Sequence, residues 1–148
     1  MDAFPKFLEA YEKRELIFYM DESVFSANQV NQKIWFSPQT EPVMIEKKKL
    51  GFKAIAVAAA INLQGEVIAW HVRDGAIDSD SYILFLRQVI KYTRRRKCKM
   101  MVDNLGVHRT KDVTEFCAKH RIQLIFNGTY SSWANPIERL WAWTKQRF

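Results

Sequence analysis

Two short apolar runs, each ending directly on an aspartate, constrain the fold of this chain more than any other feature. Residues 16–20 read Leu-Ile-Phe-Tyr-Met and precede Asp21, while residues 98–102 read Cys-Lys-Met-Met-Val and precede Asp103. Each run is too short for a lone helix, and the first is rich in strand-forming residues, so each predicts a buried strand. Both strands then carry an acidic side chain at their carboxyl end.

The remaining segments predict a sheet with helices packed on it. Apolar residues 52–63 and residues 66–73 flank Gln64-Gly65, a pattern typical of a hairpin. The spacing of apolar residues predicts the other elements: helices over 4–13, from the cap at 78–81 to about 92, after Thr110 and after Asn135, a strand over 122–126, and a candidate strand over 34–36. This order predicts an α/β fold, a mixed sheet flanked by helices on both faces.

Length and composition predict one ordinary globular domain. The 148 residues are 48% apolar, which is enough for a hydrophobic core without disulfides or a structural metal. The chain contains no run of eighteen apolar residues and no signal-peptide pattern, so we expect a cytoplasmic protein. Cys98 and Cys117 lack the paired spacing of a zinc site, and we expect them to be buried free thiols.

The net charge is positive and favours a polyanionic partner. The chain has 23 lysines and arginines against 16 acidic residues, a formal net charge of +7. Arg94, Arg95 and Arg96 follow the predicted helix that ends near residue 92. They are suited to the negative end of that helix and to a soluble surface, or to contact with nucleic acid.

Three acidic residues are candidates for one metal site. If the strands before Asp21 and Asp103 are neighbours, their carboxylates converge and repel each other unless a cation lies between them. Carboxylates without a pair of nitrogen or sulfur ligands favour Mg²⁺ or Mn²⁺ over zinc. Glu138 is the third candidate, because its helix follows the last strand directly. The alternative for Glu138 is a capping box, with Asn135 as N-cap and Pro136 as first helical residue.

Three motifs resemble one family of enzymes. Residues 18–23 read Phe-Tyr-Met-Asp-Glu-Ser, residues 102–108 read Val-Asp-Asn-Leu-Gly-Val-His, and residues 130–141 read Tyr-Ser-Ser-Trp-Ala-Asn-Pro-Ile-Glu-Arg-Leu-Trp. Between Asp103 and Glu138 lie 34 residues. The motifs, their order and this spacing resemble the DDE transposases of the mariner-like superfamily, in its bacterial insertion-sequence branch. The catalytic domain of that family has a ribonuclease-H-like fold with a five-stranded mixed sheet.

The resemblance implies a site, a reaction and partners. Asp21, Asp103 and Glu138 are expected to bind two Mg²⁺ ions, which Mn²⁺ can replace. The enzyme is expected to hydrolyse phosphodiesters at transposon ends and to join the 3′-hydroxyl ends to target DNA. Double-stranded DNA is then the substrate, and a homodimer is expected on DNA. Six further residues are expected beside the metal site or in contact with DNA: Glu22, Asn104, His108, Arg109, Trp133 and Asn135.

The resemblance also bears on domain organisation and leaves two alternatives. Residues 1–148 are expected to form a single catalytic domain, with residues 1–14 as the stub of an upstream linker helix. No helix-turn-helix unit precedes Leu16, so we expect a separate chain or N-terminal region to supply DNA recognition. The expected location is the bacterial cytoplasm, on the nucleoid when DNA is bound. The alternatives are a ribonuclease-H-like nuclease without strand transfer and a catalytically idle DNA-binding remnant.

Overall fold

The computed structural model describes residues 3–26, 53–127 and 135–147. The candidate strand at 34–36 and Trp133 lie outside these residues. The elements, in chain order, are α1 (Ala3–Glu12), β1 (Leu16–Phe25), β2 (Ile55–Asn62), β3 (Val67–Asp74), α2 (Ser79–Thr93), β4 (Cys98–Val102), the short 3-10 helix η2 (Gly106–Arg109), α3 (Lys111–Lys119), β5 (Ile122–Phe126) and α4 (Ile137–Lys145). In these parts of the chain, no helix has the length and apolar character needed to cross a membrane.

The strands form the five-stranded mixed sheet that was predicted, in the order β3-β2-β1-β4-β5. The pairs β1/β2 and β2/β3 are antiparallel, whereas β1/β4 and β4/β5 are parallel. The hairpin between β2 and β3 turns at Gly65, whose φ of 82° is one that glycine adopts without strain. Parallel pairing of β1, β4 and β5 brings their carboxyl ends to one edge of the sheet.

The strand β1 is longer than its apolar run. It continues to Phe25, so the expectation that Asp21 ends the strand is wrong. The reason is its partner β2, which pairs with residues 18–25 and keeps this polar stretch extended. On the other side β4 pairs only with residues 16–19. Asp21 therefore lies within a strand but beyond the end of pairing with β4.

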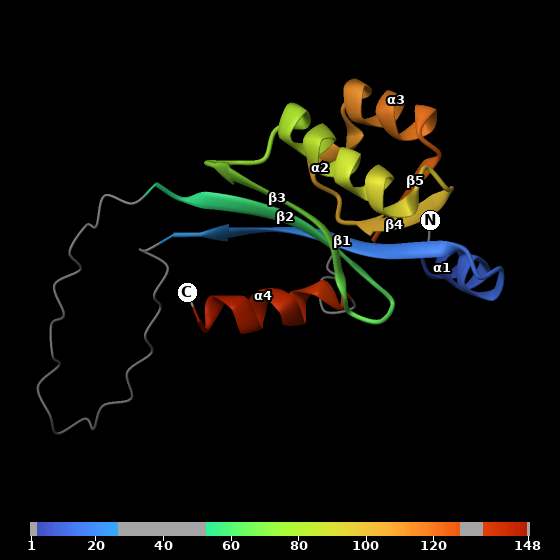
Figure 1. Cartoon of the computed structure of the whole chain (residues 1–148), viewed down its shortest axis with the longest axis horizontal. Helices are drawn as coiled ribbons and strands as arrows, with labels where there is room; N and C mark the ends of the chain where they lie inside the picture. The colour runs from blue at the N-terminus through green and yellow to red at the C-terminus, as the bar shows by residue number, and fades with distance from the viewer. Residues whose placement is uncertain (1–2, 27–52, 128–134, 148) are drawn as a thin grey trace, which may run out of the picture.

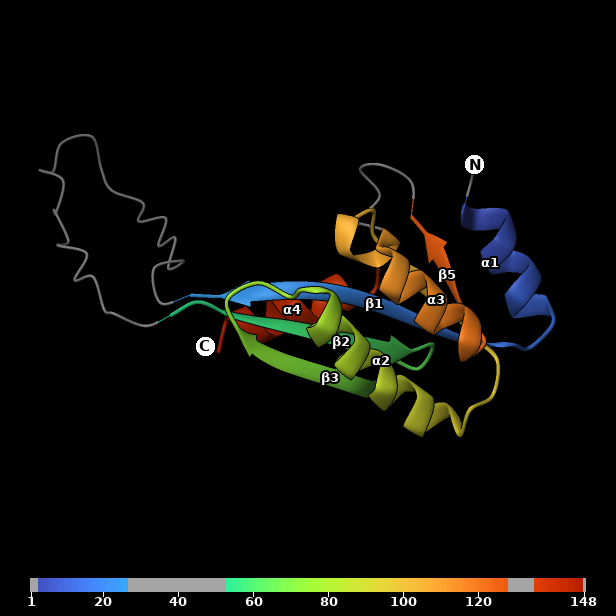
Figure 2. The same ribbon diagram turned by 90° about the horizontal axis from the view of Figure 1, so that it is seen from above.

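Helices cover both faces of the sheet, as predicted. Figure 1 shows α2 and α3 on one face and α4 on the other, and Figure 2 shows α1 beside β5 at the end of the sheet. The larger core lies between the sheet and α2, and includes Phe18, Met20, Phe85 and Leu86. A smaller core under α4 contains the residues Phe25, Ala59, Ile61, Ile137 and Trp141.

Both cysteines are buried free thiols, as expected. Burial raises the pKa of Cys98 to about 11 and that of Cys117 to about 12. Each thiol therefore stays protonated at neutral pH and behaves as a small apolar core residue.

Candidate active site

Asp21 and Asp103 come to the same edge of the sheet because β1 and β4 are parallel neighbours. Tyr19 is opposite Met101 in the observed register. Two residues further along each chain are Asp21 and Asp103, the second of which directly follows β4. The structure thus confirms that the two strands are adjacent, on which the convergence of these carboxylates depends.

Asp21 points toward α4 and is held by a tryptophan. The indole Nε1 of Trp141 donates a hydrogen bond of 3.0 Å to Asp21 Oδ2. Burial raises the pKa of Asp21 most, and the negative charges of Glu138, Glu22 and Asp103 add to it, so that the pKa is about 6. These acids lie close enough to disfavour the ionised form of Asp21, so the arrangement favours a bound cation.

The first turn of α4 presents Glu138 to this edge. Asn135 is buried and anchors the start of the helix to β1, because its Nδ2 donates to Met20 O at 3.3 Å. Its Oδ1 accepts from the amide of Ile137 at 3.4 Å. Pro136 occupies the cap position, and among the described residues no hydrogen bond joins the Glu138 carboxylate to the Asn135 amide. The capping-box alternative is therefore not supported, and Glu138 is available for another role.

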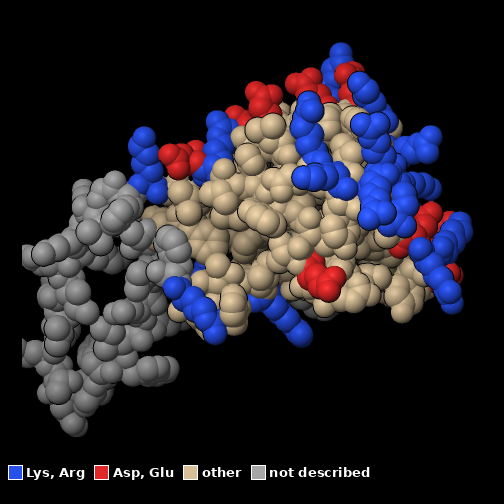
Figure 3. Space-filling model, viewed as in Figure 1, with Lys and Arg blue, Asp and Glu red and all other residues tan. Residues whose placement is uncertain are grey.

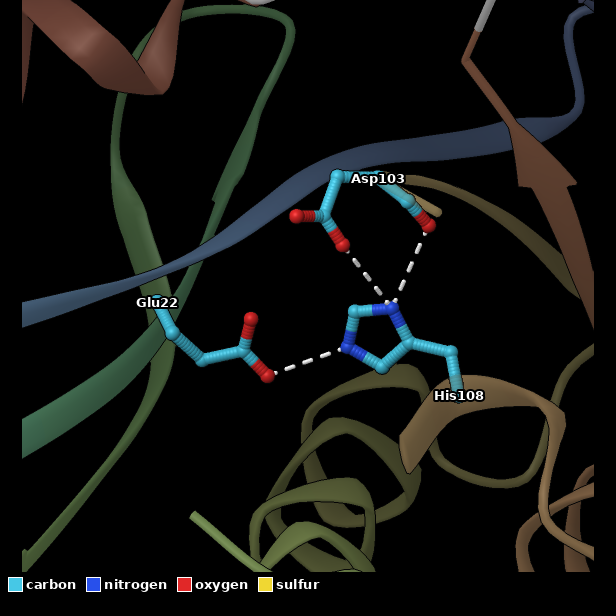
Figure 4. Close-up of side chains that lie close together, drawn as sticks. All are labelled: Glu22, Asp103 and His108. Carbon is cyan, nitrogen blue, oxygen red and sulfur yellow. Dashed lines mark hydrogen bonds and ion pairs between the residues drawn. The ribbon is translucent and has the colours of Figure 1, made fainter. Parts of the chain in front are cut away.

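A buried histidine joins the second aspartate to Glu22. Figure 4 shows His108 between the two carboxylates. Its Nε2 lies 3.0 Å from Glu22 Oε1, and its Nδ1 lies 3.2 Å from Asp103 Oδ1 and 3.3 Å from Asp103 O. The ring has no exposed surface and packs on Tyr82, with ring centroids 4.7 Å apart. This geometry fixes the orientation of both acids.

The two acids set the protonation of His108. Burial opposes its charge, yet the bonds to Asp103 and Glu22 outweigh burial and raise its pKa to about 9. Burial raises the pKa of Asp103, but the hydrogen bonds from His108 and from the Leu105 amide outweigh burial. The pKa of Asp103 therefore lies below its usual value. At neutral pH the group is therefore an imidazolium between two carboxylates.

The neighbouring residues Asp21 and Glu22 point to opposite faces of β1, as successive strand residues do. Asp21 contacts α4, whereas Glu22 contacts η2 through His108. In the described parts of the chain, the one cluster whose potential metal-ligand atoms all lie within 4.8 Å is Glu22, Asp103 and His108. The predicted trio of Asp21, Asp103 and Glu138 does not form so tight a cluster.

Two further predicted residues brace the loop after β4. Asn104 donates through Nδ2 to Asn127 O at 2.6 Å, at the end of β5. Arg109 donates to Asn104 Oδ1 at 2.5 Å and lies over the ring of Phe126, 4.5 Å from its centroid. These contacts hold the loop that carries Asp103 against β5.

Trp141 is the functional neighbour that sequence reasoning missed. Its helical spacing assigned it to the apolar face of the last helix, and it is indeed 5% exposed and packs on Phe25. It lies three residues after Glu138, on the same side of the helix. That spacing, together with the polar end of an indole ring, is the signal that could have placed it beside Asp21.

The donor set at this edge fits a hard divalent cation. Asp21, Glu22, Asp103 and Glu138 supply carboxylate oxygens, whereas both nitrogens of the protonated His108 are engaged by Glu22 and Asp103. In the described chain, the Oε2 atom of Glu22 is buried and has no hydrogen-bond partner. Oxygen ligands in excess of nitrogen ligands suit Mg²⁺ or Mn²⁺.

A family model matches most of the chain. The model of the DDE superfamily endonucleases matches residues 16–148. This chain belongs to that family. The match begins at β1, contains every acidic residue of the candidate site, and includes the three motifs on which the resemblance was based. No curated protein matches the chain.

Solved structures of transposases share the fold of this DDE domain. The Mos1 strand transfer complex has a TM-score of 0.69 and 16% identity, covering 96% of this chain and 45% of its own. The Mos1 paired-end complex with Mn has a TM-score of 0.69, 15% identity, and coverages of 96% and 46%. The Mos1 catalytic domain with raltegravir and Mg has a TM-score of 0.65, 14% identity, and coverages of 98% and 68%. The chain thus spans about half the length of the first two proteins.

Proposed function

We propose that this chain is the catalytic domain of a transposase, which cuts phosphodiesters at transposon ends and joins the freed 3′-hydroxyl ends to target DNA. The observation that carries the proposal is the gathering of acidic residues at the carboxyl edge of the parallel strands, in a DDE-family chain. The likeness in fold to the Mos1 strand transfer complex supports transfer in addition to hydrolysis.

Asp21, Asp103 and Glu138 are proposed to hold two Mg²⁺ ions, which Mn²⁺ can replace. Mos1 structures with Mn and with Mg support this choice of metal. When bound, such ions activate an attacking water or hydroxyl and stabilise the leaving oxygen. The fit is supported by the raised pKa of Asp21, about 6, and by the Asp103 side chain, which is 42% exposed and accessible from solvent.

The surrounding residues orient these carboxylates. Trp141 donates to Asp21 Oδ2 and so fixes the orientation of this carboxylate. His108 donates to one oxygen of Asp103 and, through its other nitrogen, keeps Glu22 on the opposite face of β1. Asn135 ties the start of α4 to β1 and thereby holds Glu138 at the site. Carboxylates positioned in this way bind metal without a large cost of reordering.

Duplex DNA is the proposed partner, and a homodimer is the proposed assembly on DNA. The structures of the Mos1 strand transfer and paired-end complexes support DNA as the partner. Recognition of transposon ends is proposed to reside in a separate chain or an N-terminal region. Asn104 and Arg109, which brace the loop after β4, are proposed to keep Asp103 in place when DNA is bound.

A nicking and joining assay tests the proposal. The protein is incubated with supercoiled plasmid and Mn²⁺, and separately with a labelled duplex that ends in a free 3′-hydroxyl. Asp103→Ala should reduce both products at least about 100-fold, because a metal ligand is lost. The matched control Asp112→Ala removes an exposed carboxylate from α3 and should leave both unchanged.

Each alternative predicts a different outcome of this assay. Equal activity of the wild type and Asp103→Ala contradicts the assignment of the site. Nicking without joining favours a nuclease of ribonuclease-H-like fold that does not transfer strands. DNA binding with neither product favours an idle DNA-binding remnant.

A further inference from the structure

The edge of the sheet opposite to the acidic site is surrounded by cations. Because β1, β4 and β5 are parallel, their first residues lie together at that edge. Figure 3 shows lysine and arginine side chains gathered toward the end of the molecule where α1 and the end of α2 lie. We call the following six exposed residues the basic end: Arg14, Arg87, Lys91, Arg94, Arg95 and Arg96.

The charge of the basic end is not neutralised within the described chain. None of its six side chains forms an ion pair with a described residue. Two nearby acids, Glu9 and Glu15, are already engaged by other lysines: Lys13, Lys97 and Lys99. The positive charge of the basic end is therefore left for solvent or for a polyanion.

The surface of the basic end is concave on both sides of the α2 terminus. A hollow of about 800 Å³ is lined by Arg14, Arg94 and Arg96, together with Glu12 and the already paired Glu15. A second hollow, of about 550 Å³, is lined by Arg87, Lys91 and Arg95, and again by Arg94. Guanidinium groups in a concave surface match the oxygens of a phosphate backbone.

The backbone conformation of these arginines is that of helix ends. The non-glycine residues with positive φ in the described chain are all arginines: Arg14 at 52°, Arg94 at 51°, Arg95 at 62° and Arg121 at 60°. Glycine adopts this conformation freely, whereas a side chain there is strained. Three of the four belong to the basic end. Arg94 is the C-cap of α2, Arg95 follows it, and Arg14 and Arg121 follow the ends of α1 and α3, so helix termination accounts for this conformation.

We propose that the basic end binds the phosphate backbone of duplex DNA, as a contact separate from the DNA segment that is cut. The choice of DNA as the polyanion rests on the proposed function. The two surfaces are distinct, because β1 rises about 17 Å from Leu16 to Asp21 at about 3.3 Å per residue. The basic end is thus proposed to contact a portion of the DNA other than the phosphodiester that is cut.

The double substitution Arg94→Gly/Arg95→Gly tests this proposal. It removes two charges and relieves the strained conformation, so the protein should melt no lower than the wild type. Affinity for a labelled random-sequence duplex of about 30 base pairs is measured by fluorescence anisotropy in EDTA, across a series of KCl concentrations. We expect a salt slope smaller by about 1.8 and a loss of affinity on the order of 50-fold near 0.1 M salt.

Three further variants isolate the cause. Arg94→Lys/Arg95→Lys keeps the charge and should stay within about threefold of the wild type. Arg94→Asn/Arg95→Asn also tolerates positive φ and should lose as much affinity as the glycine variant. Lys53→Ala/Lys111→Ala removes the same charge from other parts of the surface and should have little effect.

Several results would overturn the proposal. These are unchanged affinity of the glycine variant, an equal loss in the Lys53/Lys111 control, or tighter binding of RNA or single strands than of duplex. Binding in EDTA does not need catalysis, so failure of the nicking assay leaves this test intact.

Discussion

At the scale of single residues, the site combines favourable contacts with charges that repel. Asp21 gains a hydrogen bond from Trp141, but its partial burial and the nearby acids raise its pKa to about 6. His108 gains two carboxylate partners that outweigh its burial. Without metal, therefore, ionised Asp21 destabilises the fold, whereas protonated His108 stabilises it.

The substitution Asp21→Asn should stabilise the metal-free protein. The pKa of Asp21 is 3.8 before folding and about 6 after it, so this residue lowers stability as pH rises from about 4 to about 6, and the cost is complete above that pH. At pH 8 the variant should gain about 2–3 kcal/mol in free energy of unfolding, and below about pH 4 the gain should vanish. Urea unfolding in EDTA measures this, with Asp112→Asn as an exposed control. A destabilised variant at pH 8 would contradict the expectation.

His108 should make the stability of the protein fall in alkaline solution. Its pKa is 6.5 before folding and about 9 after it, so its contribution is complete below pH 6.5 and is lost as pH rises through about 9. The loss should reach up to about 3 kcal/mol in EDTA. In His108→Asn this loss should be absent, and in His120→Asn it should persist. An unchanged pH profile in His108→Asn would refute the role of this ion pair.

At the scale of elements, the site depends on how α4 is attached to β1. The helix buries Ile137 and Trp141, one turn apart, against Phe25 and the β1–β2 pair. Asn135 adds a polar tie to the backbone of Met20. The same contacts that stabilise α4 place Glu138 at the acidic edge, so packing of this helix and metal binding are coupled.

The truncation Ile137→Ala should weaken both stability and metal binding. Ile137 is fully buried, so its truncation should cost about 2–4 kcal/mol in free energy of unfolding. Because Glu138 follows directly, Mn²⁺ affinity should fall as well. Urea unfolding and Mn²⁺ titration measure the two effects. Trp143→Ala, on the exposed side of α4, should cost less than about 1 kcal/mol.

At the scale of the whole molecule, opposite charges are found at opposite edges of one sheet. Parallel pairing of β1, β4 and β5 gathers the carboxylates at one edge and leaves the basic end at the other. A divalent cation would reduce the repulsion among the carboxylates at the acidic edge. A polyanion would reduce the repulsion among the cations of the basic end. Ligands of both kinds should therefore stabilise the fold.

Manganese should raise the melting temperature of the wild-type protein. A ligand that binds only the folded state at about 100 times its Kd adds about 2.7 kcal/mol to the free energy of unfolding. Thermal melts across a Mn²⁺ series measure this effect without any assay of activity. Asp21→Asn and Asp103→Ala should each reduce it, and Asp112→Ala should not. A melting temperature that does not change with Mn²⁺ concentration would argue against a metal site.

Local sequence patterns determined most of the elements of this protein. The apolar runs before Asp21 and Asp103 form strands, Gly65 turns the hairpin, and Asp78 caps α2 through a 3.0 Å bond from the Ser81 amide. These features follow from backbone geometry and from neighbours a few residues away, so a single sequence suffices to predict them. The three acidic positions of the proposed metal site were also visible as motifs with characteristic spacing.

Only the tertiary structure decided how those acids are arranged. The extension of β1 to Phe25 requires pairing with β2, which lies far along the chain. The contacts of Asp21 with Trp141 and of Glu22 with His108 join residues 120 and 86 positions apart. Which acid faces which helix depends on strand register and helix packing. These are non-local, so no local pattern in the sequence encodes them.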